Sequence, residues 1–181
     1  SSLFALVAAP GKAWQSISSK EESQATFLNG YLYPIMGITA LSVFVNLLND
    51  QFTLEKALKL MTIDFVKFFV GFYIASFLID ELLQKFFDRE KNPKQVQLFV
   101  GYTLSVYMLI TIFLNLFMGM FSFLRFAPLY IIYIIWEGSK YYMDINENKR
   151  LMFVVLSSLI LIFSPDIIER FMFILMPGLG N

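Results

Sequence analysis

The sequence has neither cysteine nor histidine among its 181 residues. Without cysteine the chain has no disulfide and no thiolate nucleophile, and without histidine it lacks the most common general base. The same absences remove the usual protein ligands of zinc, iron–sulfur clusters and haem. We therefore expect no cofactor and no metal centre.

Charged residues are scarce. They make up 15% of the chain, whereas a soluble domain carries about a quarter. Apolar residues make up 57% of the chain, and the mean hydropathy is +0.65. A surface with so little charge is solvated by lipid, so the composition predicts an integral membrane protein whose first partner is the bilayer.

The sequence also lacks the common catalytic motifs. It has no glycine-rich phosphate loop, no Walker-type lysine, no metal-ligand spacing and no nucleophile–base set. The 14 basic and 14 acidic residues balance, and the basic ones are dispersed through short loops, which argues against nucleic-acid binding. We expect neither an enzyme nor a nucleic-acid partner.

Long apolar runs predict the fold class. A hydrocarbon core of about 30 Å needs about 20 apolar residues in a helix, and open sheet cannot cross it. The sequence therefore predicts an all-α, polytopic membrane protein, a bundle of five transmembrane helices between an N-terminal segment (1–26) and a short tail (177–181). The predicted spans cover residues 27–48, 57–83, 96–118, 123–142 and 151–176.

Two prolines mark irregular places in these spans. Pro128 is predicted in the first turn of the fourth span, where a missing N–H matters least. The triplet Ser164-Pro165-Asp166 has the character of a helix start inside an apolar stretch. We expect the fifth span to be kinked at Pro165 or broken into two half-helices there.

Basic residues are unevenly divided between the two predicted sides. Nine lie on the side of the N-terminus and three on the other, which by the positive-inside rule predicts a cytoplasmic N-terminus and an external C-terminus. The two sets are Lys12, Lys20, Lys85, Arg89, Lys91, Lys94, Lys140, Lys149 and Arg150, against Lys56, Lys59 and Arg125.

The segment from Leu3 to Ser18 is too short and too polar to cross the membrane. Its apolar residues can share one helix face, which predicts an interfacial element on the cytoplasmic leaflet with Trp14 at the level of the headgroups. The alternative is a disordered tail.

Five ionisable residues lie within or beside the outer halves of the predicted spans: Asp64, Lys67, Arg125, Glu169 and Arg170. Such residues face the bundle interior and have partners. Asp64 and Lys67 are three residues apart, so they can pair on one helix face. The five form either an outward-facing polar site for an ion or small solute, or structural ion pairs that fix helix register. In the second case Asp64 pairs with Lys67 or Arg170, and Glu169 with Arg125.

Two short segments carry a resemblance to a known family. They are Pro10-Gly11-Lys12-Ala13-Trp14-Gln15-Ser16-Ile17 before the first span and Gly101-Tyr102-Thr103-Leu104-Ser105 in the third. The sequence is similar in these places to the Yip1 family of five-span membrane proteins, especially its short bacterial members. The family-like positions are Pro10, Trp14, Ile17, Gly101 and Tyr102.

The resemblance implies the five-span fold, the same topology, location in a bacterial inner membrane and a role in membrane organisation. Two features depart from the family. Tyr107 and Met108 stand where a proline often follows the second segment, and the "DLYGP" motif of the eukaryotic members is absent. The engagement of Rab-type GTPases by those members is therefore not carried over.

Two hypotheses about function remain from the sequence. The first is a non-enzymatic scaffold or adaptor that binds other membrane proteins, with homo-oligomerisation as a further possibility. The second is a small channel or transporter that uses the five intramembrane charges. A transporter should have a polar cavity that reaches mid-membrane and is lined by Lys67, whereas a scaffold should have its charges paired.

Overall fold

A computed structural model describes residues 2–117, 120, 122–176 and 178, without the side chains of residues 122, 124 and 125. Every regular element in these ranges is helical, which confirms the predicted all-α class. η1 is a π-helix, and η2 and η3 are 3₁₀ helices. In order the elements are α1 (Ser2–Ala8), α2 (Pro10–Ser18), α3 (Gln24–Phe27), η1 (Leu28–Leu32), α4 (Tyr33–Ser42), η2 (Val43–Leu48), α5 (Leu54–Phe87), α6 (Pro93–Leu116), η3 (Ser122–Leu129), α7 (Tyr130–Tyr141) and α8 (Glu147–Leu175).

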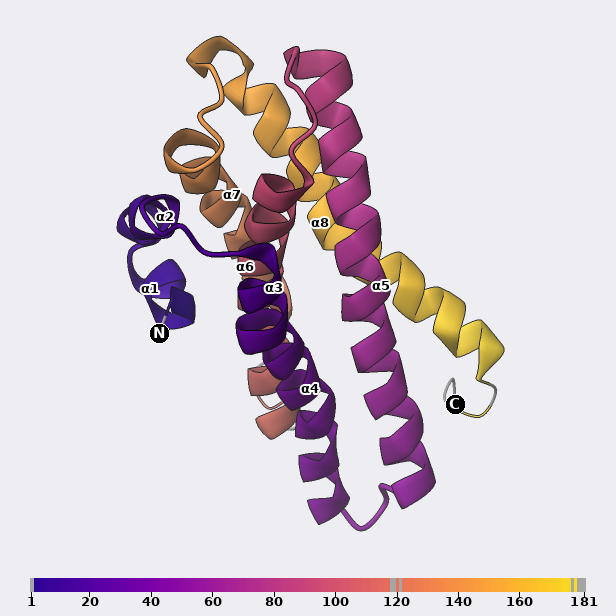
Figure 1. Ribbon diagram of the computed structural model, residues 1–181. Helices are drawn as coiled ribbons and strands as arrows, with labels where there is room; N and C mark the ends of the chain where they lie inside the picture. The colour runs from indigo at the N-terminus through magenta and orange to yellow at the C-terminus, as the bar shows by residue number, and fades with distance from the viewer. Residues whose placement is uncertain (1, 118–119, 121, 177, 179–181) are drawn as a thin grey trace.

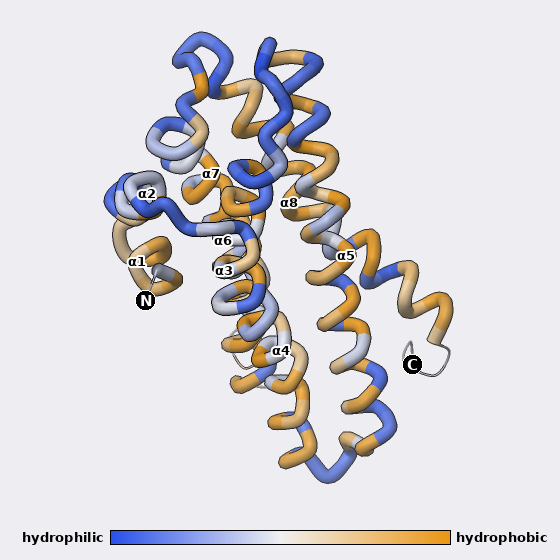
Figure 2. Tube along the Cα trace, viewed as in Figure 1, coloured by the Kyte–Doolittle hydropathy of each residue, from blue (hydrophilic) through white to orange (hydrophobic). Residues whose placement is uncertain are grey.

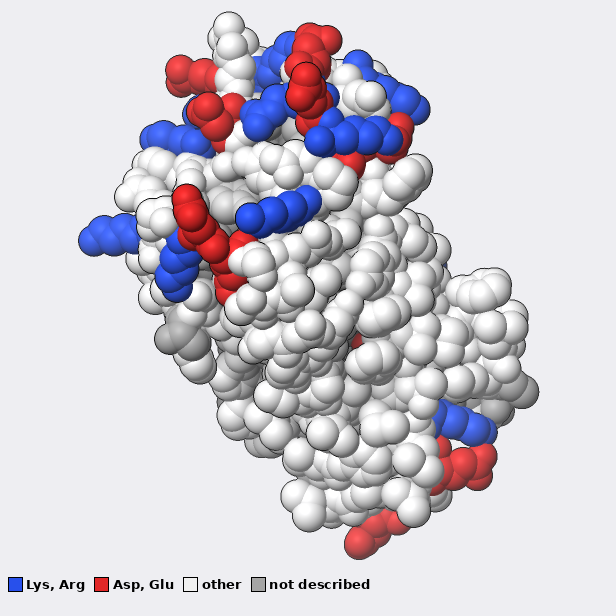
Figure 3. Space-filling model, viewed as in Figure 1, with Lys and Arg blue, Asp and Glu red and all other residues white. Residues whose placement is uncertain are grey.

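Long helices run along the length of the molecule and are joined by loops at its two ends (Figure 1). Four helical stretches of the described chain are long and apolar enough to cross a membrane: 24–48, 54–87, 93–116 and 147–175. The hydropathy along the chain is highest in the middle of these helices and lowest in the loops (Figure 2). On the face shown in Figure 3, charged side chains gather at the upper end and leave a broad uncharged waist.

Local capping explains where the long helices begin. The Thr53 side chain accepts the Lys56 N–H before α5, and the Asn92 side chain accepts the Gln95 N–H before α6. Such caps satisfy amide groups that have no partner inside the helix. α5 ends at Phe87, and the next residue, Asp88, adopts a left-handed conformation with φ 53°. The helix ends therefore lie at the polar residues that flank each apolar run.

The predicted fourth span has an irregular first half. Residues 122–129 form the 3₁₀ helix η3 with Pro128 inside it, and the α-helix begins only at Tyr130. The expected place of Pro128 in the first turn of an α-helix is therefore wrong. η3 and α7 nevertheless run back alongside α6. Pro128 of η3 lines the same cavity as Leu114 near the end of α6. At the other end, the Gln95 side chain near the start of α6 donates to the Tyr142 carbonyl just after α7.

α8 continues without interruption past Pro165. The expected alternative of two half-helices is therefore wrong. Pro165 lies against α5 at Gly71, where an added Cβ atom would come 3.4 Å from the proline nitrogen. The absent N–H at Pro165 faces a neighbouring helix rather than lipid, which is how proline is tolerated in membrane helices.

The N-terminal segment is helical and packed against the bundle. The Trp14 side chain is fully buried, and its Nε1–H donates to the Ile134 carbonyl of α7 at 3.0 Å. Trp14 therefore does not lie among lipid headgroups, and the segment is not a disordered tail. Helical periodicity alone could not reveal this, because a face that docks on protein and a face that docks on lipid are both apolar.

Close approach at Gly138 makes this docking possible. A Cβ atom there would lie 2.7 Å from the Phe99 ring and 2.8 Å from the Trp14 ring. The missing side chain also leaves the carbonyl of Ile134, four residues earlier, open to the indole. Gly101 plays a similar part, because a Cβ atom there would lie 2.5 Å from the Phe27 ring.

We expect Gly138→Ala to lower the free energy of unfolding by about 1–3 kcal/mol, because the added methyl group overpacks two rigid rings. Gly37→Ala is the matched control, since a Cβ atom at Gly37 meets nothing within 4 Å. That variant should be neutral or up to about 1 kcal/mol more stable. Thermal unfolding in detergent measures both, and equal stability of the two variants would contradict the close packing at Gly138.

Candidate functional site

Lys67 of α5 is the most buried cation among the described side chains. Its Nζ lies 2.8 Å from Asp64 Oδ1 on the same helix and 2.9 Å from Glu169 Oε1 on α8. Lys67 and Asp64 are only 9% and 8% exposed. The predicted Asp64–Lys67 pair is thus present, and a second carboxylate from the last helix completes it.

The depth of this group follows from helix geometry. α5 has 34 residues, so at a rise of 1.5 Å per residue it is about 51 Å long and Lys67 lies about 5 Å from its midpoint. An unpaired ion at this depth is costly, and the attraction between opposite charges repays its desolvation only when the geometry is good. Two carboxylates within 2.9 Å of the ammonium meet this requirement.

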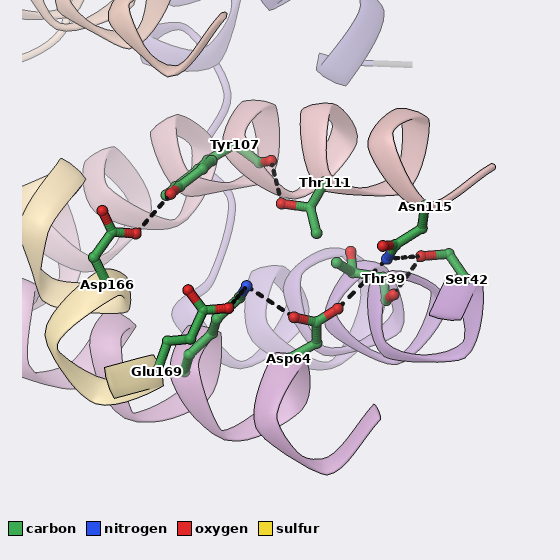
Figure 4. Close-up of polar contacts among 9 residues, drawn as sticks. Thr39, Ser42, Asp64, Tyr107, Thr111, Asn115, Asp166 and Glu169 are labelled. Atoms are coloured by element: carbon green, nitrogen blue, oxygen red, sulfur yellow. Dashed lines mark hydrogen bonds and ion pairs between the residues drawn. The ribbon is translucent and has the colours of Figure 1, made fainter. Parts of the chain in front are cut away.

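Hydrogen bonds extend the group across the bundle (Figure 4). Asn115 Nδ2 of α6 lies 3.4 Å from Asp64 Oδ2 and donates to Ser42 Oγ at 2.8 Å. Ser42 Oγ in turn donates to the Thr39 carbonyl at 2.6 Å. The polar chain therefore connects α8, α5, α6 and α4, so four helices share one network at similar depth.

Asp166 extends the polar group on α8. Its Oδ1 accepts the hydroxyl hydrogen of Tyr107 from α6 at 2.9 Å. Figure 4 shows Asp166 and Glu169 on the same side of α8, as their spacing of three residues requires. Unlike Glu169, Asp166 has no ion pair with the described side chains.

The group lines a cavity of about 570 Å³. Among its charged lining residues are three carboxylates and one ammonium. The cavity is bounded by Val43, Asn46, Leu60, Asp64, Lys67, Tyr107, Thr111, Leu114, Asn115, Pro128, Asp166 and Glu169. Its mixed apolar and polar lining and its size are those of a small-molecule site.

Three of the five predicted residues meet in this group: Asp64, Lys67 and Glu169. Arg170 is exposed and is not among the residues of the cavity wall. Adjacent residues on a helix point about 100° apart, so Arg170 cannot share the face of Glu169. The side chain of Arg125 lies outside the described part of the chain.

Several residues of the polar group were not among the five predicted site residues. Asp166 could have been included, because it is three residues from Glu169 and therefore lies on the same face. The sequence holds no such signal for Tyr107, Ser42 and Thr39. Uncharged polar residues are common in membrane helices, and only the packing of the helices brings these three together.

The family-like residues form a separate cluster. Pro10, Trp14 and Ile17 are all buried and follow the spacing of one helix face. The Tyr102 ring lies 6.2 Å from the Trp14 ring, and its hydroxyl donates to Glu22 Oε2 at 2.7 Å. These positions therefore tie the N-terminal helices to α6 and α7, and their geometry indicates packing rather than chemistry.

We expect Lys67→Met to destabilise the protein by about 3–5 kcal/mol, because it leaves two carboxylates without a cation inside the bundle. The triple variant that adds Asp64→Leu and Glu169→Leu should recover much of this loss. Arg170→Met is the control for the loss of an exposed charge and should have little effect. The check is thermal unfolding in detergent; equal losses in the single and triple variants would contradict the ion-pair account.

Among the described residues no group of three or more histidine, cysteine, aspartate or glutamate side chains is placed to hold a metal ion. No curated protein and no solved structure matches the chain. The model of the Yip1 domain family matches residues 4–165. This match spans nearly the whole chain and includes every family-like position named above, so the protein belongs to the Yip1 domain family of membrane proteins.

Proposed function

We propose that the protein is a non-enzymatic scaffold or adaptor in a bacterial inner membrane, where it binds other membrane proteins. The observation that carries this proposal is the pairing of Lys67 with two carboxylates at 2.8 and 2.9 Å. An ammonium that pairs with carboxylates on α5 and on α8 stabilises the packing of these two helices. The bundle is therefore suited to present its outer surfaces at fixed positions.

The proposed topology has five crossings, with the N-terminal helices in the cytoplasm. η3 and α7 supply the fourth crossing. Their eight 3₁₀ and twelve α-helical residues extend for about 34 Å at 2.0 and 1.5 Å per residue, which is enough for a hydrocarbon core of about 30 Å. Basic residues of α2, of the loop 88–92, and of the end of α7 and the start of α8 then share the cytoplasmic side.

The surface of α1 offers a place for a partner or for the bilayer. Leu3 and Leu6 face the bundle, whereas Phe4 is 63% exposed and Val7 is also exposed. A short helix that is apolar on both sides contacts the bundle with one face and the membrane interface with the other. Partner proteins at the cytoplasmic interface would meet this second face first, and a second copy of the chain is one such partner.

A photo-crosslinking residue in place of Phe4 should capture discrete membrane-protein partners in native membranes, because this side chain points away from the bundle. The control position is Ile174, which is 77% exposed near the end of α8. Gel analysis of the adducts provides the measurement. Adducts to lipid alone at residue 4, or the same pattern at both positions, would contradict the proposed docking face.

A small transporter is the second candidate, because the 570 Å³ cavity reaches Lys67 and carries three carboxylates. Beyond the cavity the Phe68, Phe72 and Phe99 side chains are fully buried. These rings close the direct route to the other end of the bundle, so transport would require rearrangement of the helices rather than flow through an open pore.

Solute and ion flux into liposomes separates the two candidates. As a scaffold, the purified protein should give no flux above that of protein-free liposomes. Flux that is present in the wild type and absent in a folded Lys67→Met variant would overturn the scaffold proposal and identify the cavity as a transport site. The triple variant described above supplies the folded control if Lys67→Met alone is unstable.

A further inference from the structure

A second pocket lies between α5 and α6, nearer to the C-terminal end of α5. Its volume is about 250 Å³, and we name it the lateral pocket. α5 contributes four lining residues at helical spacing, and α6 contributes two. They are Tyr73, Ser76, Phe77, Asp80, Pro93 and Gln97.

The Ser76 hydroxyl has no hydrogen-bond partner among the described residues, although the residue is only 4% exposed. Several other helical hydroxyls of this chain bond to a carbonyl one turn earlier, as Ser164 does to Ile160 and Thr103 to Phe99. Ser157 and Ser158 of α8 lack a partner as Ser76 does, but they do not line this pocket. A buried polar atom without a partner costs free energy. Ser76 therefore offers an unused polar group inside the lateral pocket.

Asp80 places a carboxylate beside this hydroxyl, one turn further along α5. It is 9% exposed, and its Oδ1 accepts the Asn92 N–H at 3.2 Å. The two lysines nearest in sequence do not pair with it, because Lys85 and Lys91 both pair with Glu81. The hydrogen bond with Glu81 is the main cause that raises the pKa of Lys91, and the nearby charge of Asp80 adds a smaller contribution without forming an ion pair. Within the described chain Asp80 thus has no ion-pair partner, and its second oxygen is free.

The depth of the lateral pocket suits a lipid headgroup. Asp80 lies 9.5 residues from the midpoint of α5, or about 14 Å along the axis, which is close to half the thickness of a hydrocarbon core of about 30 Å. Tyr73 and Phe77 are exposed on the same part of α5, so the pocket opens sideways toward lipid. At this level a phospholipid presents its headgroup to the protein.

We propose that the lateral pocket binds the primary ammonium of an aminophospholipid headgroup in the adjacent leaflet. The ammonium donates to the free oxygen of Asp80 and to Ser76 Oγ, and the exposed Phe77 ring packs on the lipid below its headgroup. The volume of about 250 Å³ fits a headgroup rather than a drug-sized molecule. This site goes beyond the proposed scaffold role and gives the protein a preference among lipids.

The test compares purified protein in mixed micelles with phosphatidylethanolamine, phosphatidylcholine or phosphatidylglycerol. Phosphatidylethanolamine should give the largest increase in melting temperature and the highest occupancy by native mass spectrometry, because phosphatidylcholine has no N–H to donate. In Asp80→Asn the apparent affinity for phosphatidylethanolamine should fall about tenfold or more, since a hydrogen bond to a charged group is lost.

Two further variants make the result specific. Ser76→Ala should keep the lipid-free melting temperature of the wild type, because the hydroxyl makes no bond within the protein, and should still weaken phosphatidylethanolamine binding. Glu90→Gln, which removes an exposed carboxylate near the same end of α5 and leaves the Lys91–Glu81 pair in place, should bind the lipid like the wild type. If Asp80→Asn does not fold, the binding of phosphatidylethanolamine by Ser76→Ala tests the proposal in its place.

Three results would overturn the proposal. They are equal binding of the three lipids by the wild type, unchanged binding of phosphatidylethanolamine by Ser76→Ala, and a loss in Glu90→Gln as large as in Asp80→Asn.

Discussion

The ammonium of Lys67 lies near the middle of the longest helix, where lipid cannot solvate it. Its two carboxylate partners come from different places in the chain, one a single turn away and one 102 residues later. The two ion pairs of this ammonium therefore fix the rotation of α5 about its axis and the position of α8 against α5. Asn115 and Ser42 then connect the same group to α6 and α4, so the order of the helices around the cavity follows from a single desolvated cation.

The other half of the bundle is held together by shape rather than charge. Gly101 and Gly138 remove side chains at two points where aromatic rings from distant segments must enter. Trp14 fills one of these places and Phe27 the other. The family-like residues thus mark where the N-terminal helices dock. The long helices α5, α6 and α8 join the two parts, because they carry Lys67 and its partners in one and the packed rings of Phe87, Phe99 and Phe153 in the other.

Much of this arrangement could be predicted from the sequence, because the strongest physical signals are local. Apolar runs of about 20 residues set the long helices, and the spacing of Asp64 and Lys67 gave their pair. Glu169 was expected to pair with Arg125, whereas it pairs with Lys67, because which distant helix supplies a counter-ion depends on packing. The same limit applies to Trp14: its apolar face was visible in the sequence, but the surface that covers it, around Ile134, was 120 residues away.

The burial of Trp14 has a spectroscopic consequence. The chain has two tryptophans: Trp14, which is shielded completely between α2, α6 and α7, and Trp136, which is 39% exposed on the outer side of α7. The two indoles therefore report different environments, one the seam between the N-terminal helices and the bundle, the other the surrounding lipid or detergent. Intrinsic fluorescence of a chain that keeps only Trp14 would follow the attachment of the N-terminal helices without any added label.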